Sequence, residues 1–424
     1  MLYKHHKNSR VSFQLIQLKL QPRLTDYEWA IAINRACLKL LGAWPDNNET
    51  EQRKFNVRII SILIVMICSC LIPSIHALIR IWGDFMLMID NLQYTLPFLI
   101  VILKTCILWR KSKELAPILR MVKEDWLKFK MKRERDIMIK RARIARIITI
   151  CGYFMVVCTF IFAMLLSTFG VITPAYVTNT SDPDHWLLMP TYYIYDTNRS
   201  PSYEITLILQ SIGMISAGAI FTSTDNLLGL LIFHVCGQLE NLKTRILHLD
   251  QNDFYNTLSY NVQDHRRLIR SIKIIEDTFT LMLLGILIWF SLMFTVHGFL
   301  IVTVITQGYD LSFSRFLFIA SASVAAFAHM CLYCIVGEIL VTQCNEIFEA
   351  ACEYKWYKLE PRKAKTLLIL MIRANKPLYI TAGKLFPMTM STLCNLIKTS
   401  GGYISFCWPI VNEEKIFRSF SVAF

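Results

Sequence analysis

Seven long apolar runs are the feature of this sequence that most limits its fold. They lie at about residues 57–80, 88–109, 144–169, 205–234, 281–306, 316–341 and 384–408. A helix needs about 20 residues to cross the hydrocarbon core of a bilayer. Helices also pair their own backbone groups, which a lone strand in lipid cannot do. With 54% hydrophobic and only 18% charged residues overall, the chain is predicted to be an all-α integral membrane protein with seven transmembrane helices.

Lysine and arginine gather in every second segment between these runs. Residues 1–56 hold nine, 110–146 fourteen, 235–280 six and 342–384 eight, which is 37 of the 45 in the chain. The intervening segments hold almost none, and residues 170–204 contain only Arg199. The positive-inside rule therefore predicts a cytoplasmic N-terminus and an extracellular C-terminus. Because the formal net charge of +14 follows membrane orientation, we expect the lipid bilayer and not nucleic acid as a partner.

This orientation divides the chain into five parts. They are a cytoplasmic N-terminal segment (1–56), the first six spans with their loops (57–341), a helical cytoplasmic anchor segment (342–383), a last helix (384–408) and an extracellular tail (409–424). No apolar run precedes residue 57, so we expect no cleaved signal peptide. The sequon at Asn179 lies in the long outer loop, where it is a candidate for glycosylation.

Chemistry-bearing motifs are absent from the sequence: it has no phosphate-binding glycine loop, zinc helix or nucleophile elbow. We therefore expect no catalytic residues, no metal and no cofactor. Asp225 lies within the fourth run, where a carboxylate must face protein or water. It is either a functional polar site or a packing group satisfied by neighbouring hydroxyls. Lys104, near the cytoplasmic end of the second run, is expected to extend its ammonium group to the interface.

A ligand pocket and a pore have separate candidates. Residues in the outer halves of four runs would form a mostly apolar pocket, although each is also an ordinary packing residue: Tyr94, Thr95, Phe98, Cys158, Phe162, Ser211, Ile215, Phe318 and Ala322. Gly401 and Gly402 weaken the last helix and allow close backbone approach. The last run is therefore the best candidate for a pore-lining element.

Several segments resemble the insect odorant receptors, in particular those of ants and other Hymenoptera. The similar segments are Leu41 to Pro45, His234 to Lys243, Gly337-Glu338, Ala350 to Tyr357, and Lys376 to Pro387 continuing to Lys398-Thr399-Ser400. The resemblance covers nearly all of residues 26–406. Residues 1–25 and 407–424 depart from the family pattern, and Phe406 stands where that pattern has an aliphatic residue.

The resemblance implies seven helices with the same orientation and a heterotetrameric cation channel gated by small volatile organic ligands. It places the ligand among the second, third, fourth and sixth spans and the pore along the last one, at Tyr403, Ser405 and Phe406. The co-receptor's insertion between the fourth and fifth spans is missing, so the chain resembles a ligand-tuning subunit that pairs with the co-receptor in the plasma membrane of olfactory sensory neuron dendrites.

Two other receptor classes are alternatives. A gustatory receptor would share the topology and the channel logic and differ in ligand class. A G-protein-coupled receptor would have its N-terminus outside, which the charge distribution opposes.

Overall fold

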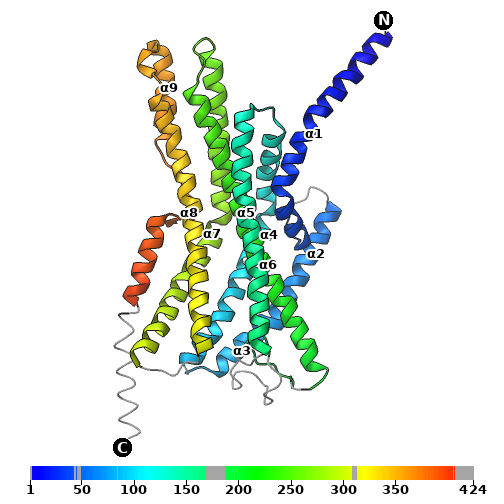
Figure 1. The fold of residues 1–424 in the computed structure, drawn as a ribbon, viewed down its shortest axis with the longest axis vertical. Coiled ribbons are helices and arrows are strands. Elements are labelled where there is room, and N and C mark those ends of the chain that lie inside the picture. The colour runs from blue at the N-terminus through cyan, green and yellow to red at the C-terminus, as the bar shows by residue number, and fades with distance from the viewer. Residues whose placement is uncertain are drawn as a thin grey trace, which may run out of the picture.

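Long helices make up almost all of the chain in the computed structural model, which describes residues 2–42, 44, 49–83, 85–168, 187–197, 199–307, 313–403 and 405 (Figure 1). In chain order they are α1 (Leu2–Leu40), α2 (Glu49–Met66), a π-helical turn (Ile67–Leu71), α3 (Ile72–Arg80), α4 (Phe85–Leu127), α5 (Lys132–Thr168), α6 (Ser202–Leu247), α7 (Phe254–Gln307), α8 (Phe313–Glu353), a 3₁₀ turn (Trp356–Lys358) and α9 (Pro361–Ala374). Two short strands follow, β1 (Thr381–Ala382) and β2 (Phe386–Pro387), and then a helix over residues 390–403. We call this last element the C-terminal helix.

Six of the predicted spans are found as helices that are long and apolar enough to cross a membrane. They are Gln52–Arg80, Leu87–Leu127, Lys132–Leu165, Ser202–Leu247, Phe254–Gly298 and Ala320–Lys358. The first is a composite of α2, the π-helical turn and α3, with Pro73 just after the turn, where the missing proline N–H disturbs regular helical pairing. The C-terminal helix lies in the seventh predicted run. The predicted all-helical membrane fold is confirmed.

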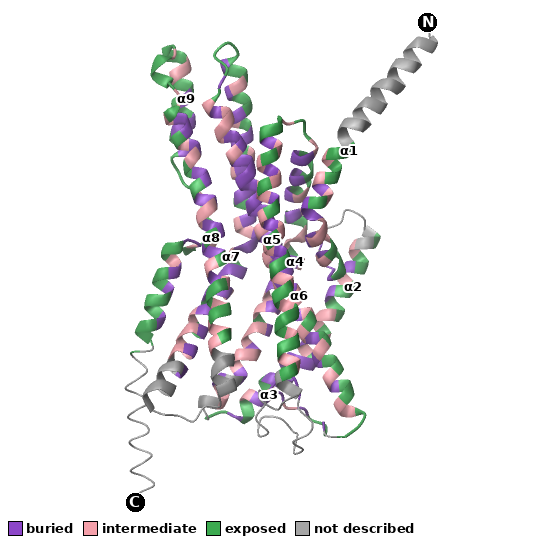
Figure 2. Cartoon of the chain, in the orientation of Figure 1, coloured by how far each residue is buried: buried purple, intermediate pink, exposed green. Residues whose placement is uncertain are grey.

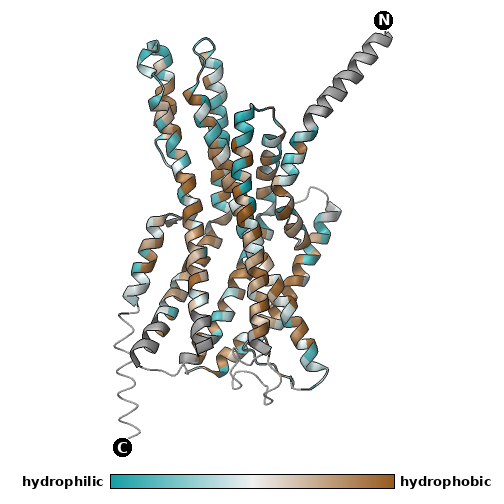
Figure 3. Cartoon of the chain, viewed as in Figure 1, coloured by the Kyte–Doolittle hydropathy of each residue, from teal (hydrophilic) through white to brown (hydrophobic). Residues whose placement is uncertain are grey.

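The helices alternate in direction, so that equivalent connections meet at one end of the molecule. In Figure 1 the α4–α5 turn, the α6–α7 turn and the α8–α9 connection all lie at the upper end, where hydrophilic residues collect in Figure 3. These connections belong to the basic segments that the charge pattern places in the cytoplasm. The lower half of the helices is the membrane-spanning part.

Apolar side chains remain exposed on the spanning half, as a lipid-facing surface requires. Figures 2 and 3 show helices there that are both exposed and hydrophobic. The exposed residues include Ile60, Ile64, Ile72, Ile79, Phe154, Val157, Ile161, Leu165, Ile208, Ile212, Ile288, Leu292 and Val324. Such a large apolar surface is unusual on a soluble monomer, and the chain is a multi-pass membrane protein.

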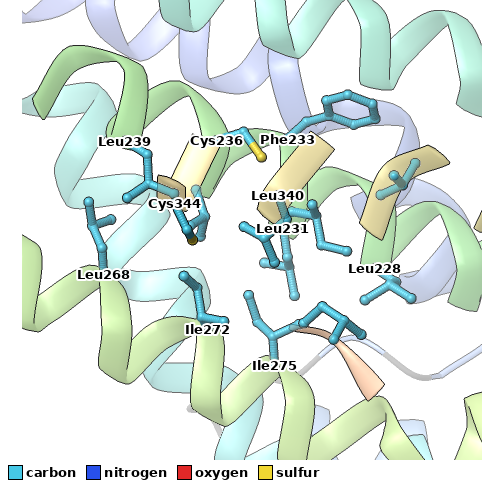
Figure 4. Packing of buried hydrophobic residues seen from close by; sticks show 14 of the residues in the cluster. Leu228, Leu231, Phe233, Cys236, Leu239, Leu268, Ile272, Ile275, Leu340 and Cys344 are labelled. Carbon is cyan, nitrogen blue, oxygen red and sulfur yellow. The ribbon is translucent and has the colours of Figure 1, made fainter. Parts of the chain in front are cut away.

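The main hydrophobic core joins α6, α7 and α8 (Figure 4). Its labelled members come from three helices: Leu228, Leu231, Phe233, Cys236 and Leu239 from α6, Leu268, Ile272 and Ile275 from α7, and Leu340 and Cys344 from α8. Side chains at helical spacing on the extension of α6 thus pack into the core. The extended helices form one packed body at the end that the charge pattern predicts to be cytoplasmic, and we call it the cytoplasmic body.

Ion pairs reinforce that body between α4, α6 and α7. Asp125, whose side chain is fully buried, contacts Arg267 at 2.7 Å and His234 at 3.1 Å. Arg267 also bonds Asp264 at 2.8 Å, and Arg245 bonds the same carboxylate. In the neighbouring α4–α5 turn, burial lowers the pKa of Lys130 against the attraction of nearby carboxylates. Because each buried charge has a partner, this network holds the helix extensions in one arrangement.

The C-terminal helix begins at residue 390 and not at Lys384, where the apolar run begins. Gly383 and Lys384 have φ of 64° and 59°, and this left-handed turn reverses the chain between β1 and β2, which pair antiparallel. The turn is fixed because the Gly383 N–H donates to the Thr280 carbonyl of α7 at 2.8 Å and the Met388 N–H to the Ile380 carbonyl at 2.8 Å. Proline at position 387 offers no N–H to continue a helix backwards.

Candidate functional site

A cavity of about 240 Å³ lies within the spanning half, between α4, α6, α7 and α8. Its lining is mainly aromatic and small apolar side chains with a few polar groups: Gln93, Tyr94, Phe221, Trp289, Phe290, Met293, His297, Ala322, Ala325, Ala326 and His329. Small-molecule sites commonly have this composition. We call it the α7–α8 cavity, because those two helices supply most of its wall.

Short side chains on α8 create the cavity's volume. Ala322, Ala325 and Ala326 face large rings on α7, among them Trp289 and Phe290. Protein interiors are densely packed. An alanine opposite an aromatic ring leaves a gap, whereas a leucine at the same position would fill that gap. The alanine-rich run of α8 thus contributes to the wall of a cavity.

A buried charged cluster adjoins the cavity on its cytoplasmic side. Lys104 of α4, with no exposed side-chain surface, donates to Asp225 of α6 at 2.6 Å and to the hydroxyl of Tyr333 of α8 at 3.3 Å. His329 contacts the other Asp225 oxygen at 3.2 Å. The Lys104 ammonium also lies 3.3 Å from the centre of the Phe221 ring, a cation–π contact. The cluster links three helices, and Phe221 and His329 belong to both the cluster and the cavity wall.

The expectation for Lys104 was therefore wrong. A lysine near the end of a span commonly extends its ammonium group to water. Here the Asp225 carboxylate is a closer partner, and the ammonium group stays inside the bundle. Asp225 is satisfied by Lys104 and His329 across helices, whereas the neighbouring hydroxyls of Ser223 and Thr224 donate to carbonyls of their own helix.

The C-terminal helix packs through one face only. Leu393, Leu396 and Ser400 are buried, and the Ser400 hydroxyl donates to the Ser291 carbonyl of α7 at 3.4 Å. Most of the remaining described residues of this helix, including Met390, Ile397 and Tyr403, are exposed. A spanning helix with one packed face has its other faces free for lipid, for another subunit or for a water-filled pore.

Comparison with known proteins identifies the family. The 7tm Odorant receptor family matches residues 84–401, about three quarters of the chain. The chain belongs to this odorant receptor family.

Individual relatives agree with the family match. "Odorant receptor 10" of Aedes albopictus is 24% identical over 340 residues, which cover 78% of this chain and 86% of that protein. "Odorant receptor 85c" of Drosophila melanogaster is 23% identical over 218 residues, 49% of this chain and 53% of that protein. In fold the receptor is similar to the insect olfactory receptor OR5 from Machilis hrabei in complex with eugenol, with a TM-score of 0.76 and 17% identity, over 92% of this chain and 99% of that one.

Within the receptor, the residues expected to bind ligand do not all meet. Tyr94 and Ala322 line the α7–α8 cavity. Thr95 and Phe98 are buried on α4, while Cys158, Phe162 and Ile215 are exposed and Ser211 is half-buried. The side chain of Phe318 lies outside the described residues. The proposed pore residues Tyr403 and Ser405 are exposed, and Phe406, like Asn179, is outside the described residues.

Sequence reasoning missed the α7 wall of the cavity. The expectation drawn from the family resemblance named no residue of the fifth span, yet Trp289, Phe290, Met293 and His297 all line this space. One signal was available, because His297 and His329 are ionisable side chains inside apolar runs, and such residues are expensive in a membrane unless they have a role.

Proposed function

We propose that this chain is the ligand-tuning subunit of a heteromeric odorant-gated non-selective cation channel. It assembles with the odorant co-receptor as a heterotetramer in the plasma membrane of olfactory sensory neuron dendrites and responds to a small volatile organic ligand. Family membership and the fold it shares with a receptor bound to eugenol support this proposal.

The observation that carries the channel part is the single packed face of the C-terminal helix. Residues 394, 395, 398 and 399 are exposed beside Ile397 and Tyr403, so this helix presents a mixed polar and apolar surface away from its own chain. Around a four-subunit axis, four such surfaces would enclose a polar path. Tyr403, Ser405 and Phe406 are the residues we assign to that path.

The connection between α6 and α7 supports the ligand-tuning role. Helix α6 ends at Leu247 and α7 begins at Phe254, so only six residues join them. No room exists for the co-receptor-type insertion at this place. The chain therefore resembles the variable subunit of such a channel.

Gating follows from the position of α7 between the two sites. Phe290 and Met293 of α7 line the cavity, while the carbonyl of Ser291, between them in sequence, accepts the hydrogen bond from Ser400 of the C-terminal helix. A ligand that fits the cavity better when α7 takes its open position shifts the population toward the open channel. The shift is limited by the difference in ligand affinity between the two states.

The test is to express the chain with and without the co-receptor and to record currents under an odorant panel. We expect a ligand-gated cation current that needs both subunits and whose ligand preference changes with this chain. A response through G proteins without a ligand-gated current would reject the proposal.

A further inference from the structure

Two polar atoms in the wall of the α7–α8 cavity have no hydrogen-bond partner among the described residues. They are the indole Nε1 of Trp289 and the Nε2 of His297, and both atoms are buried. His297 as a whole is 4% exposed. Leaving a buried polar group unpaired is costly, so such groups in a native fold call for an explanation.

Two other polar groups of the wall are already engaged. The Nδ1 of His297 pairs with the Ser323 hydroxyl at 2.9 Å, and His329 contacts Asp225. Phe221 and Trp289 are in an edge contact, with ring centroids 6.2 Å apart. The unpaired atoms thus lie in a mainly apolar, aromatic wall.

We propose that the α7–α8 cavity binds small apolar molecules carrying a hydroxyl or another oxygen acceptor, with Trp289 as the hydrogen-bond donor that selects them. An indole N–H can only donate, so the matching ligand atom is an acceptor. The role of His297 Nε2 depends on its tautomer, and a hydroxyl suits either one because it both donates and accepts. This inference deepens the proposed odorant-gated function and rests on it.

The dimensions of the cavity restrict the ligand further. Its volume of about 240 Å³ is below the range of about 300–1,000 Å³ that is usual for drug-sized ligands. Trp289 and His297 are eight residues apart on α7, a rise of about 12 Å. A single-ring alcohol therefore places its oxygen at one of these positions and its ring against Phe290, Met293 and the alanines of α8.

Photolabelling of the complete chain in membranes tests this without any current. The probes are a trifluoromethyl-diazirinyl benzyl alcohol and the matching toluene, which has the same skeleton without oxygen. We expect saturable labelling of peptides spanning residues 289–297 and 322–329, with the alcohol effective at about a fivefold lower concentration, the effect of one hydrogen bond.

Variants separate the hydrogen bond from packing. Trp289→Phe should remove most of the alcohol's advantage and leave labelling by the toluene unchanged. His297→Asn keeps an amide where Nδ1 meets Ser323 and removes the Nε2 position, so it tests the second polar point. The control is Trp82→Phe, a tryptophan that is 75% exposed, and it should keep the full difference.

Two results would overturn the inference. One is saturable labelling near Cys158, Phe162 and Ser211 without any on α7, and the other is an alcohol advantage that survives Trp289→Phe. Labelling as expected in a chain that gives no current with the co-receptor would reject the channel proposal and leave this one standing.

Discussion

Lys104 places a positive charge inside the helix bundle and depends on Asp225 for its counter-charge. Its side chain is fully buried and that of Asp225 is 15% exposed, so neither charge is well solvated by water. Removing one partner of a buried pair leaves an uncompensated charge, whereas replacing both by apolar groups is often neutral. The cluster therefore fixes how α4, α6 and α8 meet, and it contributes to stability only while it is complete.

Asp225→Asn is expected to destabilise the receptor by about 3 to 5 kcal/mol. The same loss is expected for Lys104→Met, whereas the double variant Lys104→Met/Asp225→Asn should recover a large part of it. Thermal unfolding of the detergent-solubilised protein measures all three. Lys111→Met, which breaks the exposed pair with Glu114, is the control and should change stability by less than about 1 kcal/mol. Strictly additive single effects would show that the two residues do not act as a pair.

Residue-level roles were the least predictable from the sequence. Asp225 could be flagged because a carboxylate in an apolar run is costly by itself, a property of one position. Its partner Lys104 is 121 residues away, and only the relative placement of α4 and α6 brings them together. The same reason explains why Tyr94 and Ala322 meet in the cavity while Cys158 does not.

Gly337 and Glu338 of α8 position the start of the C-terminal helix. A Cβ atom added at Gly337 would lie 1.9 Å from the carbonyl oxygen of Met388, so only glycine allows this backbone approach. The Glu338 carboxylate accepts the Met390 N–H at 3.3 Å, at the end of the helix where unpaired N–H groups and the positive dipole favour an acid. Together the two residues set where the C-terminal helix leaves the cytoplasmic body.

Gly337→Ala is expected to displace residues 381–388 and to impair the ligand-gated current strongly. The clash is with backbone, which cannot rotate away as a side chain can. Gly229→Ala on α6 is the matched control, because nothing lies within 4 Å of a Cβ there and alanine favours a helix by up to about 1 kcal/mol over glycine. Currents and limited proteolysis near residue 384 measure the difference. Equal behaviour of the two variants would contradict the assigned role of Gly337.

Elements were predictable where the signal is local. Each of the first six spans follows from apolar length alone, and the extension of α6 follows from helical spacing of its apolar residues. The β1–β2 hairpin was not foreseen, because Leu385 and Phe386 continue an apolar run while the turn is imposed by Gly383, Pro387 and contacts with α7. Those contacts depend on tertiary structure, which periodicity does not contain.

The whole molecule divides into a densely packed cytoplasmic half and a spanning half that contains the cavity. The main core cluster runs through the helix extensions and reaches Phe290 in the cavity wall, whereas a smaller cluster around Met66, Cys70, Phe98 and Ala217 joins the first span to α4 and α6. A ligand in the α7–α8 cavity acts on the spanning half, whereas ion pairs such as Asp125–Arg267 hold the helix extensions in one arrangement.

The orientation of this arrangement can be tested on intact cells. Epitopes placed before Met1 and between Asp250 and Gln251, in the turn joining α6 and α7, should be inaccessible to antibody until the membrane is permeabilised, because both segments carry the basic residues that stay in the cytoplasm. The extracellular face is tested separately. Glycosylation at Asn179 should give a shift in gel mobility on deglycosylation, and Asn179→Gln should abolish this shift. Labelling of either epitope on intact cells would show that the membrane orientation is the opposite of the predicted one. The C-terminal helix would then enter the membrane from outside, and the cytoplasmic body that holds its first turn through Glu338 would be extracellular.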